Sequence, residues 1–421
     1  MDAVEIGPVP PERRTQSAFD LFLIFAGANI VATTLQTGAS LAPAAASPIA
    51  LASLLVAGVL GGSLLVAILA ALGPRLGVPS VIAARAALGR RGAALVALLL
   101  YGTNFAWIAV NNVIAASACA AVWGGRGSER VWSGALGLLA TAIVAGGPRL
   151  VARADRLAVP LLALVGAALT AAVLRLPDMP GAATAAGTLS WARGLDIVAG
   201  YQVSWILMFA DYSRYTRSEG RAVGAVFAGL AATSLWLIPL GLLAARAAGT
   251  PEPGAMLQAL GVGGWGAVLL AVATLTTNFV NIYMSGLALR SLAPRAGDQA
   301  AIWSTGLVGA LLGLFPGAWL DRYAGFMVLL GGILVPVGGV LAARFFVVRR
   351  VVDVASLYAE DARGGLPRFD SRGLVAWAAG AAAYAAAAPI GGTVPSLVTA
   401  VAVYWLLDKV GTGKRNSARS C

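Results

Sequence analysis

ATLTTNFVNIY, residues 273–283, is a cluster of hydroxyl and amide side chains inside an apolar run long enough to span a bilayer. At helical spacing one stripe holds Thr274, Thr277, Asn278, Asn281 and Ser285, with Ala273 and Thr276 beside it. Polar side chains at that depth are costly unless they face partners, water or a ligand. The stretch therefore predicts the wall of a polar site near the middle of a membrane.

Apolar runs of about 20 residues recur along the whole chain, which is the length that crosses a bilayer as a helix. Hydrophobic residues make up 59% of the 421 residues and charged residues 11%, against about 25% charged in soluble proteins. The mean hydropathy is +0.82. The sequence predicts an all-α polytopic membrane protein with about twelve spans, at 18–43, 47–72, 92–123, 131–147, 157–174, 195–210, 222–245, 263–289, 301–319, 323–343, 373–388 and 393–407.

The net charge of +12 follows the expected topology. Most of the 30 lysines and arginines lie in the N-terminal segment, the even-numbered loops and the tail, which places both termini in the cytoplasm. Nucleic acid is therefore not an expected partner; the lipid bilayer and a small molecule are. We expect no cleavable signal before the first span, because residues 1–17 are polar and charged. The preference for Arg over Lys and for Ala and Gly is typical of a GC-rich bacterial genome and predicts a bacterial cytoplasmic (inner) membrane. We also expect the protein to function as a monomer.

The spans divide into ten and two around one polar stretch, residues 349–372. We expect a cytoplasmic segment at 1–17, a ten-helix core at 18–348, a cytoplasmic connector at 349–372, two accessory helices at 373–407 and a cytoplasmic tail at 408–421. Ten spans suggest two five-helix repeats, about 18–174 and 195–348, a known plan for secondary transporters. The similarity between the two halves is weak.

The first helix of each half is where a transporter of this plan interrupts its helix. In FAGANIVATT, residues 25–34, Gly27 and Asn29 mark the expected break, and Asn29 is a gating or structural candidate. In IVAGYQVSWILMFADYSRY, residues 197–215, the expected break is Gly200-Tyr201-Gln202. Close helix packing at the two glycines is the alternative.

The third span contains YGTNFAWIAVNN, in which Trp107 and Asn111 lie one turn apart with Asn104 a turn earlier. An indole beside an amide suits a flat heterocycle, because the ring can stack while the amide donates and accepts hydrogen bonds. A tryptophan that only anchors the helix at a lipid interface is the alternative.

Small and hydroxyl side chains on the eighth span, Ala273, Thr276 and Thr277, could hold a dehydrated cation. Carbonyls freed where the first span unwinds, at Ala28 and Val31, would complete an oxygen shell for Na⁺. Hydrogen bonds between helices are the alternative role for the threonines. Neutral oxygens favour Na⁺, whereas Asp20 and Asp211 at span ends keep H⁺ open as the coupling ion.

Asp211 and Arg214 close the sixth span in the stretch ADYSRY, either paired with each other or held against GVPSVIAARAALGRRG after the second span. We expect a structural or gating role for both. The chain has no histidine, and its spans contain no paired carboxylate or reactive thiol, so neither an enzyme nor a further cofactor is expected. Nothing in the sequence indicates the filter of a channel.

These motifs together resemble the nucleobase:cation symporter-1 family across nearly the full length. The resemblance rests on RRT before the first span, GANI, GVPSVIAARAALG, AWIAVNN, ADYSRY and TTNFVNIYMSGL. It is greatest to the cytosine permease and hydroxymethylpyrimidine permease-like branch. It implies a LeuT-type fold with inverted repeats and cation-coupled uptake by alternating access.

By motif, Trp107 matches the family's stacking tryptophan, Asn111 its amide position and Asn281 its eighth-helix asparagine. Ala273, Thr276 and Thr277 match the sodium-site positions, with Ala28 and Val31 as the carbonyl ligands. Together with Tyr201, Gln202 and Asn278, these residues form the expected substrate and cation sites.

Two departures from the family pattern bear on the substrate. Gln202 stands where some relatives have a second tryptophan, with Trp205 one turn further on, and this favours a small pyrimidine over a bulky hydantoin. Arg344-Phe345 replaces an acidic–aromatic pair near the end of the tenth span. We expect import of cytosine or hydroxymethylpyrimidine; a purine, allantoin, a hydantoin or an amino acid is the alternative on the same fold.

Overall fold

The computed structural model describes residues 7–44, 47–124, 127–147, 150–151, 161, 164, 166–175, 189–293, 295, 297–348, 351–359 and 366–417. The helices are α1 (Ala18–Asn29), α2 (Ala32–Ala39), α3 (Pro48–Ala70), α4 (Leu72–Leu76), α5 (Ser80–Leu88), α6 (Arg90–Trp123), α7 (Ser128–Ala145), α9 (Trp191–Val203), α10 (Glu219–Ala248), α11 (Pro253–Ala259), α12 (Gly263–Leu292), α13 (Asp298–Leu312), α14 (Pro316–Leu320), α15 (Tyr323–Ala342), α16 (Val354–Tyr358), α17 (Ser371–Ala386) and α18 (Thr393–Ser417). Short 3₁₀ or π turns are η1 (Pro11–Arg13), η2 (Ser204–Met208), η3 (Ser213–Tyr215) and η4 (Ala343–Val347).

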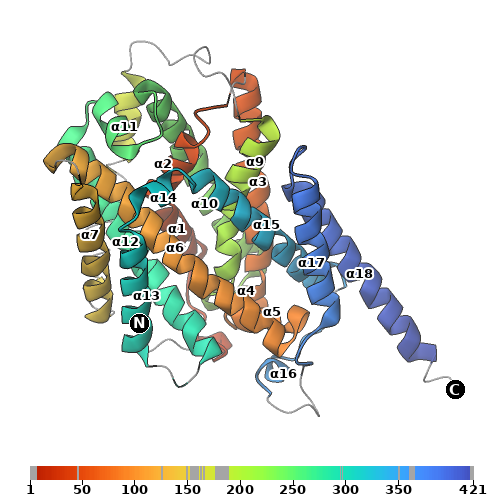
Figure 1. Cartoon of the computed structure of the whole chain (residues 1–421). Helices are drawn as coiled ribbons and strands as arrows, with labels where there is room; N and C mark the ends of the chain where they lie inside the picture. Colours follow the sequence, from red (N-terminus) through yellow and green to blue (C-terminus); the bar gives the residue numbers. More distant parts are fainter. Residues whose placement is uncertain are drawn as a thin grey trace.

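Long apolar helices dominate the part of the chain that the structure describes (Figure 1). Six helical segments there are long and apolar enough to cross a membrane by themselves, and α1 with α2 adds a seventh as a bent pair. Helices α9, α13 and α17 coincide with predicted spans but have only 13, 15 and 16 residues. The predicted span 157–174 lies partly outside the described residues. The polytopic all-α architecture is confirmed, while helix length alone identifies fewer than twelve spans.

The first span breaks where the sequence predicts it. Helix α1 ends at Asn29, α2 begins at Ala32, and their axes differ by 57°. Val31 is extended, with φ −138° and ψ 162°, so the regular amide-to-carbonyl pattern stops there. A Cβ added at Gly27 would meet nothing within 4 Å, so this glycine does not serve close helix packing.

The second expected break lies further along the chain than the sequence predicts. Helix α9 continues through Gly200, Tyr201 and Gln202 to Val203 and then tightens into the 3₁₀ turn η2. A Cβ at Gly200 would lie 2.0 Å from the Met327 carbonyl oxygen of α15. This glycine therefore lets two helices approach closely, which was the alternative reading of the same signal.

The last two helices form a pair at one side of the molecule, next to α15 (Figure 1). At one end, the carboxylate of Asp196 in α9 accepts hydrogen bonds from the amides of Gly392 and Thr393 at 2.8 and 3.0 Å. This carboxylate thus satisfies amides at the start of α18, which otherwise lack partners. The accessory pair is therefore anchored to the ten-helix core through α9.

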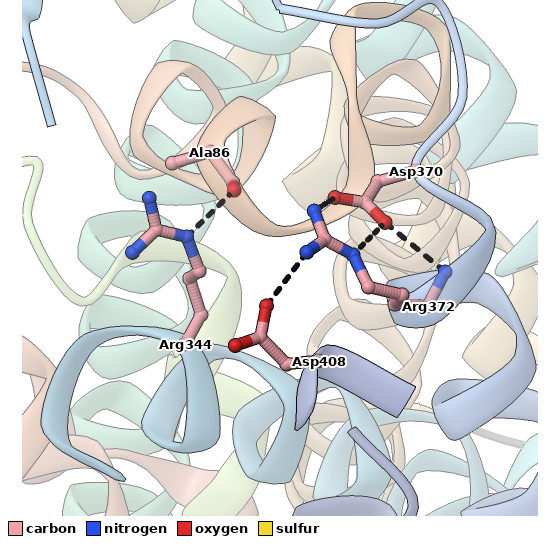
Figure 2. A network of polar contacts seen from close by, with 5 residues as sticks. All are labelled: Ala86, Arg344, Asp370, Arg372 and Asp408. Carbon is pink, nitrogen blue, oxygen red and sulfur yellow. Dashed lines mark hydrogen bonds and ion pairs between the residues drawn. The ribbon is translucent and has the colours of Figure 1, made fainter. Parts of the chain in front are cut away.

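A charged cluster fixes the other end of the accessory pair (Figure 2). Arg372 of α17 bonds both oxygens of Asp370 and lies 2.6 Å from Asp408 of α18. Arg344, in η4 at the end of α15, donates to the carbonyl of Ala86 in α5 at 3.1 Å. The role of Arg344-Phe345 left open by the sequence is therefore partly structural: the arginine ties α15 to a carbonyl near the end of α5.

Candidate functional site

A cavity lies where the α1–α2 break meets α6, α9, η2 and α12. It encloses about 560 Å³ not filled by protein atoms, part of it open to solvent. The lining residues are Ala28, Val31, Thr33, Leu100, Thr103, Asn104, Trp107, Tyr201, Ser204, Trp205, Leu207, Met208, Thr277, Val280 and Asn281. Six residues expected at the substrate or cation site thus line this one cavity: Trp107, Tyr201, Asn281, Ala28, Val31 and Thr277.

Aromatic rings from three elements, α6, α9 and η2, line this cavity. Trp107 of α6 meets Tyr201 of α9 edge to face, with ring centroids 6.2 Å apart and planes at 76°. Trp205 also lines the cavity and packs on Phe25 of α1 at 5.6 Å. Trp205 lies one helical turn beyond Tyr201, so it projects from the same side of the chain. Trp205 was not among the ligands predicted from the sequence, although its four-residue spacing from Tyr201 was the available signal.

The polar stripe on α12 serves two purposes. The hydroxyl of Thr274 donates to the backbone carbonyl of Asn111 at 3.0 Å, and Ser285 accepts from Asn104 at 2.9 Å. Both bonds join α12 to α6. Thr277 and Asn281 face the cavity instead. Thr274 and Ser285 thus serve contacts between helices, whereas Thr277 and Asn281 are available to a ligand.

An amide cluster between α6 and α12 contains two of the expected substrate ligands, Asn111 and Asn278. The side-chain NH₂ group of Asn278 donates to the side-chain oxygen of Asn112 at 2.8 Å, and the side-chain NH₂ group of Asn111 donates to the side-chain oxygen of Asn278 at 3.4 Å. All three side chains are fully buried. Asn111 and Asn278 do not line the cavity, because they pair across the α6–α12 contact. Their role as direct ligands stays a prediction that this arrangement does not favour.

Gln202 also lies away from the cavity wall. Its side chain is fully buried, and a Cβ added at Gly62 of α3 would come within 2.5 Å of the Gln202 Cβ. Gln202 thus faces α3, a quarter-turn of helix away from Tyr201. Neither of its amide atoms has a hydrogen-bond partner among the described residues.

Three candidate cation ligands lie within one turn of α12, and of these Thr277 lines the cavity, whereas Ala273 and Thr276 do not. The hydroxyls of Thr276 and Thr277 donate to the Ala273 carbonyl at 2.9 and 2.8 Å. Because their protons are directed at that carbonyl, the hydroxyl lone pairs remain available to an ion. Ala28 and Val31 reach the same cavity as Thr277. Neutral hard oxygens of this kind fit Na⁺ better than a softer metal ion.

The expected gating residues make contacts outside the cavity. Asn29 is fully buried and joins α1 to α9 and α10 through its side chain. Asp211 accepts from the Ser80 amide of α5 at 3.4 Å, so it does contact the segment after the second span. Burial raises the pKa of Asp211, and Ser80 and the charge of Arg214 partly offset this. Arg214 donates to the Gly7 carbonyl at 3.4 Å and to the Tyr215 hydroxyl at 3.0 Å.

Comparisons with known proteins place the chain in a family of transporters. A family model described as "Permease for cytosine/purines, uracil, thiamine, allantoin" matches residues 8–407. The cytosine permease of Escherichia coli (strain K12) is 26% identical over 351 residues, which cover 82% of this chain and 81% of that protein. YxlA of Bacillus subtilis (strain 168), whose name gives it provisionally as a purine-cytosine permease, is 28% identical over 243 residues, 56% of this chain and 52% of that protein.

A solved structure shares the fold over almost the whole length. Mhp1, a nucleobase-cation-symport-1 family transporter in a closed conformation with bromovinylhydantoin bound, superposes with a TM-score of 0.79. The alignment covers 97% of this chain and 96% of Mhp1 at 17% identity. The LeuT-type fold expected from the motifs is confirmed.

Proposed function

Because the chain belongs to the permease family for cytosine/purines, uracil, thiamine and allantoin, and is therefore a transporter and not an enzyme, we propose that it imports a pyrimidine-like heterocycle by cation symport. Cytosine and hydroxymethylpyrimidine are the proposed substrates. The cavity lined by Trp107, Tyr201, Trp205 and Asn281 is the observation that carries this proposal. Indole faces provide stacking for a flat ring.

Polar groups on the cavity wall suit the edge of a pyrimidine. The side-chain NH₂ group of Asn281 has no hydrogen-bond partner among the described residues, although the residue is only 7% exposed. A buried donor without a partner costs free energy, which a ring carbonyl or ring nitrogen accepting from it would recover. Asn104 reaches the same cavity from α6. We therefore assign Asn281 to the substrate edge.

The position of Trp205 favours a second candidate substrate class. From the sequence, Gln202 in the place of a second tryptophan disfavours a bulky hydantoin. Trp205 lines the cavity together with Trp107, so two indoles are available to one ligand. A hydantoin-type or purine ring held between them is the alternative substrate on the same site.

We propose Na⁺ as the coupling ion, held by the carbonyls of Ala28, Val31 and Ala273 and by the hydroxyls of Thr276 and Thr277. The titratable alternatives are less well placed, since Asp20 forms a capping box with Ser17 at the start of α1 and Asp211 contacts α5. The positive charge at the end of the molecule that holds α4 and α5 favours a cytoplasmic location for both termini. A bacterial inner membrane and a monomer complete the proposal.

Ligand binding by the purified protein tests the substrate assignment. Tryptophan fluorescence is titrated with cytosine, hydroxymethylpyrimidine, adenine, allantoin and leucine, with and without Na⁺, for the wild type and for Trp107→Ala and Asn281→Ala. We expect a pyrimidine to bind in Na⁺ and both variants to bind it at least about tenfold more weakly, since each truncation removes more than about 1.4 kcal/mol of binding.

A matched control separates site effects from general damage. Trp303→Phe changes a half-exposed tryptophan on α13 that does not line the cavity, so binding should stay at the wild-type level. Unchanged cytosine binding in Trp107→Ala and Asn281→Ala would remove the site assignment. Binding of leucine, with no binding of the heterocycles in the panel, would instead identify an amino-acid carrier.

A further inference from the structure

Asn29, the last residue of α1, has every polar atom of its side chain in use. Its NH₂ group donates to the hydroxyls of Thr233 and Ser234 in α10 at 2.8 and 2.7 Å, and its carbonyl oxygen accepts from the Tyr201 hydroxyl at 3.0 Å. The Thr233 proton points to the Gly229 carbonyl, so the Thr233 oxygen is indeed an acceptor. The side chain is fully buried, so these hydrogen bonds replace the ones that water would make.

The backbone of Asn29 belongs to the helix break that contributes the proposed cation ligands. Ala28 and Val31 line the cavity on either side of it in sequence. The backbone carbonyl of Asn29 accepts from the Thr34 hydroxyl at 2.5 Å, and the Thr34 hydroxyl lies 2.5 Å from the Tyr201 hydroxyl. The Tyr201 hydroxyl donates its own proton to the Asn29 side chain on α1, and its oxygen shares the Thr34 proton with the Asn29 backbone carbonyl. Tyr201 therefore contacts both sides of the break.

The ring of Tyr201 carries this connection to the substrate side. It lines the cavity and contacts Trp107 edge to face. A change in the geometry of the break would thus move the Tyr201 hydroxyl, and the ring would change its contact with the proposed stacking indole. No other described residue both lines the cavity and hydrogen-bonds to the side chain of Asn29.

We propose that Asn29 and the Tyr201 hydroxyl form a positioning relay through which cation binding at the α1–α2 break favours substrate binding beside Trp107. The inference rests on the proposed function. Neither residue needs to touch the cation with its side chain. Occupation of the Ala28 and Val31 carbonyls fixes the break, and the hydrogen bonds then hold the Tyr201 ring in the orientation that the substrate requires. Coupling of this kind is measured as the ratio of substrate affinities with and without the ion.

Tyr201→Phe isolates the relay, because it keeps the ring in the cavity and removes only the hydroxyl. The matched control is Tyr323→Phe: the Tyr323 hydroxyl is also buried and also bonds α2, at the Thr33 carbonyl and the Thr37 hydroxyl, but Tyr323 does not line the cavity. Both variants lose hydrogen bonds to the same helix. A purely structural effect should therefore be similar in the two.

The assay is cytosine binding by full-length protein in lipid nanodiscs, followed by tryptophan fluorescence over a range of Na⁺ concentrations. Allosteric couplings are typically about 5- to 150-fold. We expect the Na⁺-dependent gain in cytosine affinity, taken as the ratio of the affinities with and without Na⁺ in the same variant, to fall at least about fivefold in Tyr201→Phe. Tyr323→Phe should keep the wild-type ratio. Asn29→Ala should lose coupling as well, but it leaves three hydroxyls without their partner, so Tyr201→Phe carries the test.

The results separate the relay from the function on which it rests. If the wild type binds cytosine with a Na⁺-dependent gain and Tyr201→Phe keeps that gain, the relay is refuted and the proposed function stands. An equal loss in Tyr201→Phe and Tyr323→Phe also refutes the relay. If the wild type shows no Na⁺-dependent gain for cytosine or any other heterocycle of the panel, the proposed cation coupling fails, and the relay fails with it.

Discussion

Removal of the Trp205 indole tests whether the cavity offers one stacking surface or two. Trp205→Ala deletes a ring that lines the cavity and packs on Phe25. One aromatic pair contributes about 0.5–1.5 kcal/mol beyond its buried area, which corresponds to about a 2- to 13-fold change in the dissociation constant. We therefore expect cytosine binding in Na⁺ to weaken by about that factor, because the ligand loses one of its two stacking partners.

The double variant makes the prediction sharper. If Trp107 and Trp205 stack on opposite faces of one ligand, their contributions are made by separate contacts and should multiply in the double alanine variant, as independent effects do. Isothermal titration calorimetry of the wild type, the two single variants and the double variant gives the four dissociation constants. Thermal melting of each confirms that it is folded. Wild-type affinity in Trp205→Ala, alongside weakened binding in Trp107→Ala, would refute the two-ring arrangement and favour a ligand that stacks on Trp107 alone.

Three further outcomes concern stability, each followed by thermal melting of the purified protein. Gly241→Ala should destabilise by about 1–3 kcal/mol, because its Cβ would lie 1.9 Å from a backbone carbonyl of α2, whereas Gly220→Ala, with open space beside it, should be neutral. Asp408→Asn should cost about 1–3 kcal/mol, because it removes a charge-assisted hydrogen bond to Arg372 although Arg372 keeps Asp370, against at most about 1 kcal/mol for Glu219→Gln in an exposed pair. Burial raises the pKa of Asp211 above its ordinary 3.8, so the contribution of Asp211 to the free energy of unfolding is most favourable below pH about 4 and is lost as pH rises through the raised pKa. The stability of the wild type relative to Asp211→Asn should therefore fall over that pH interval. A stability difference that stays constant with pH would contradict this.

The sequence predicted the class of fold and one of its two helix breaks, and the reason for the difference is physical. Near Gly27, β-branched residues and an asparagine weaken the helix locally, and that signal is contained in the segment itself. Gly200 carries the same signal, but its role depends on the Met327 carbonyl of α15, which lies far away in sequence. A glycine that permits a break and one that permits a close contact are not distinguishable before the neighbouring helix is placed.

The candidate site was predicted in part for a related reason. Helical spacing correctly grouped Thr277 and Asn281 on one side of α12, but a stripe of that width faces both α6 and the cavity. Asn278 was therefore assigned to the ligand although it pairs with Asn112. Periodicity gives the direction of a side chain from its own helix axis. It does not give the partner that fills that direction.

The paired amides and hydroxyls between α6 and α12 have a consequence for motion. Side-chain hydrogen bonds at Asn104, Asn111 and Asn112 act at discrete positions, so sliding one helix along the other by part of a turn would break several of them at once. We therefore expect the two helices to move as one rigid unit that holds Trp107 and Thr277 at a fixed spacing. Under the proposed function, opening and closing of the cavity would then fall to the opposite wall, where α1 and α9 both lose their regular helical form.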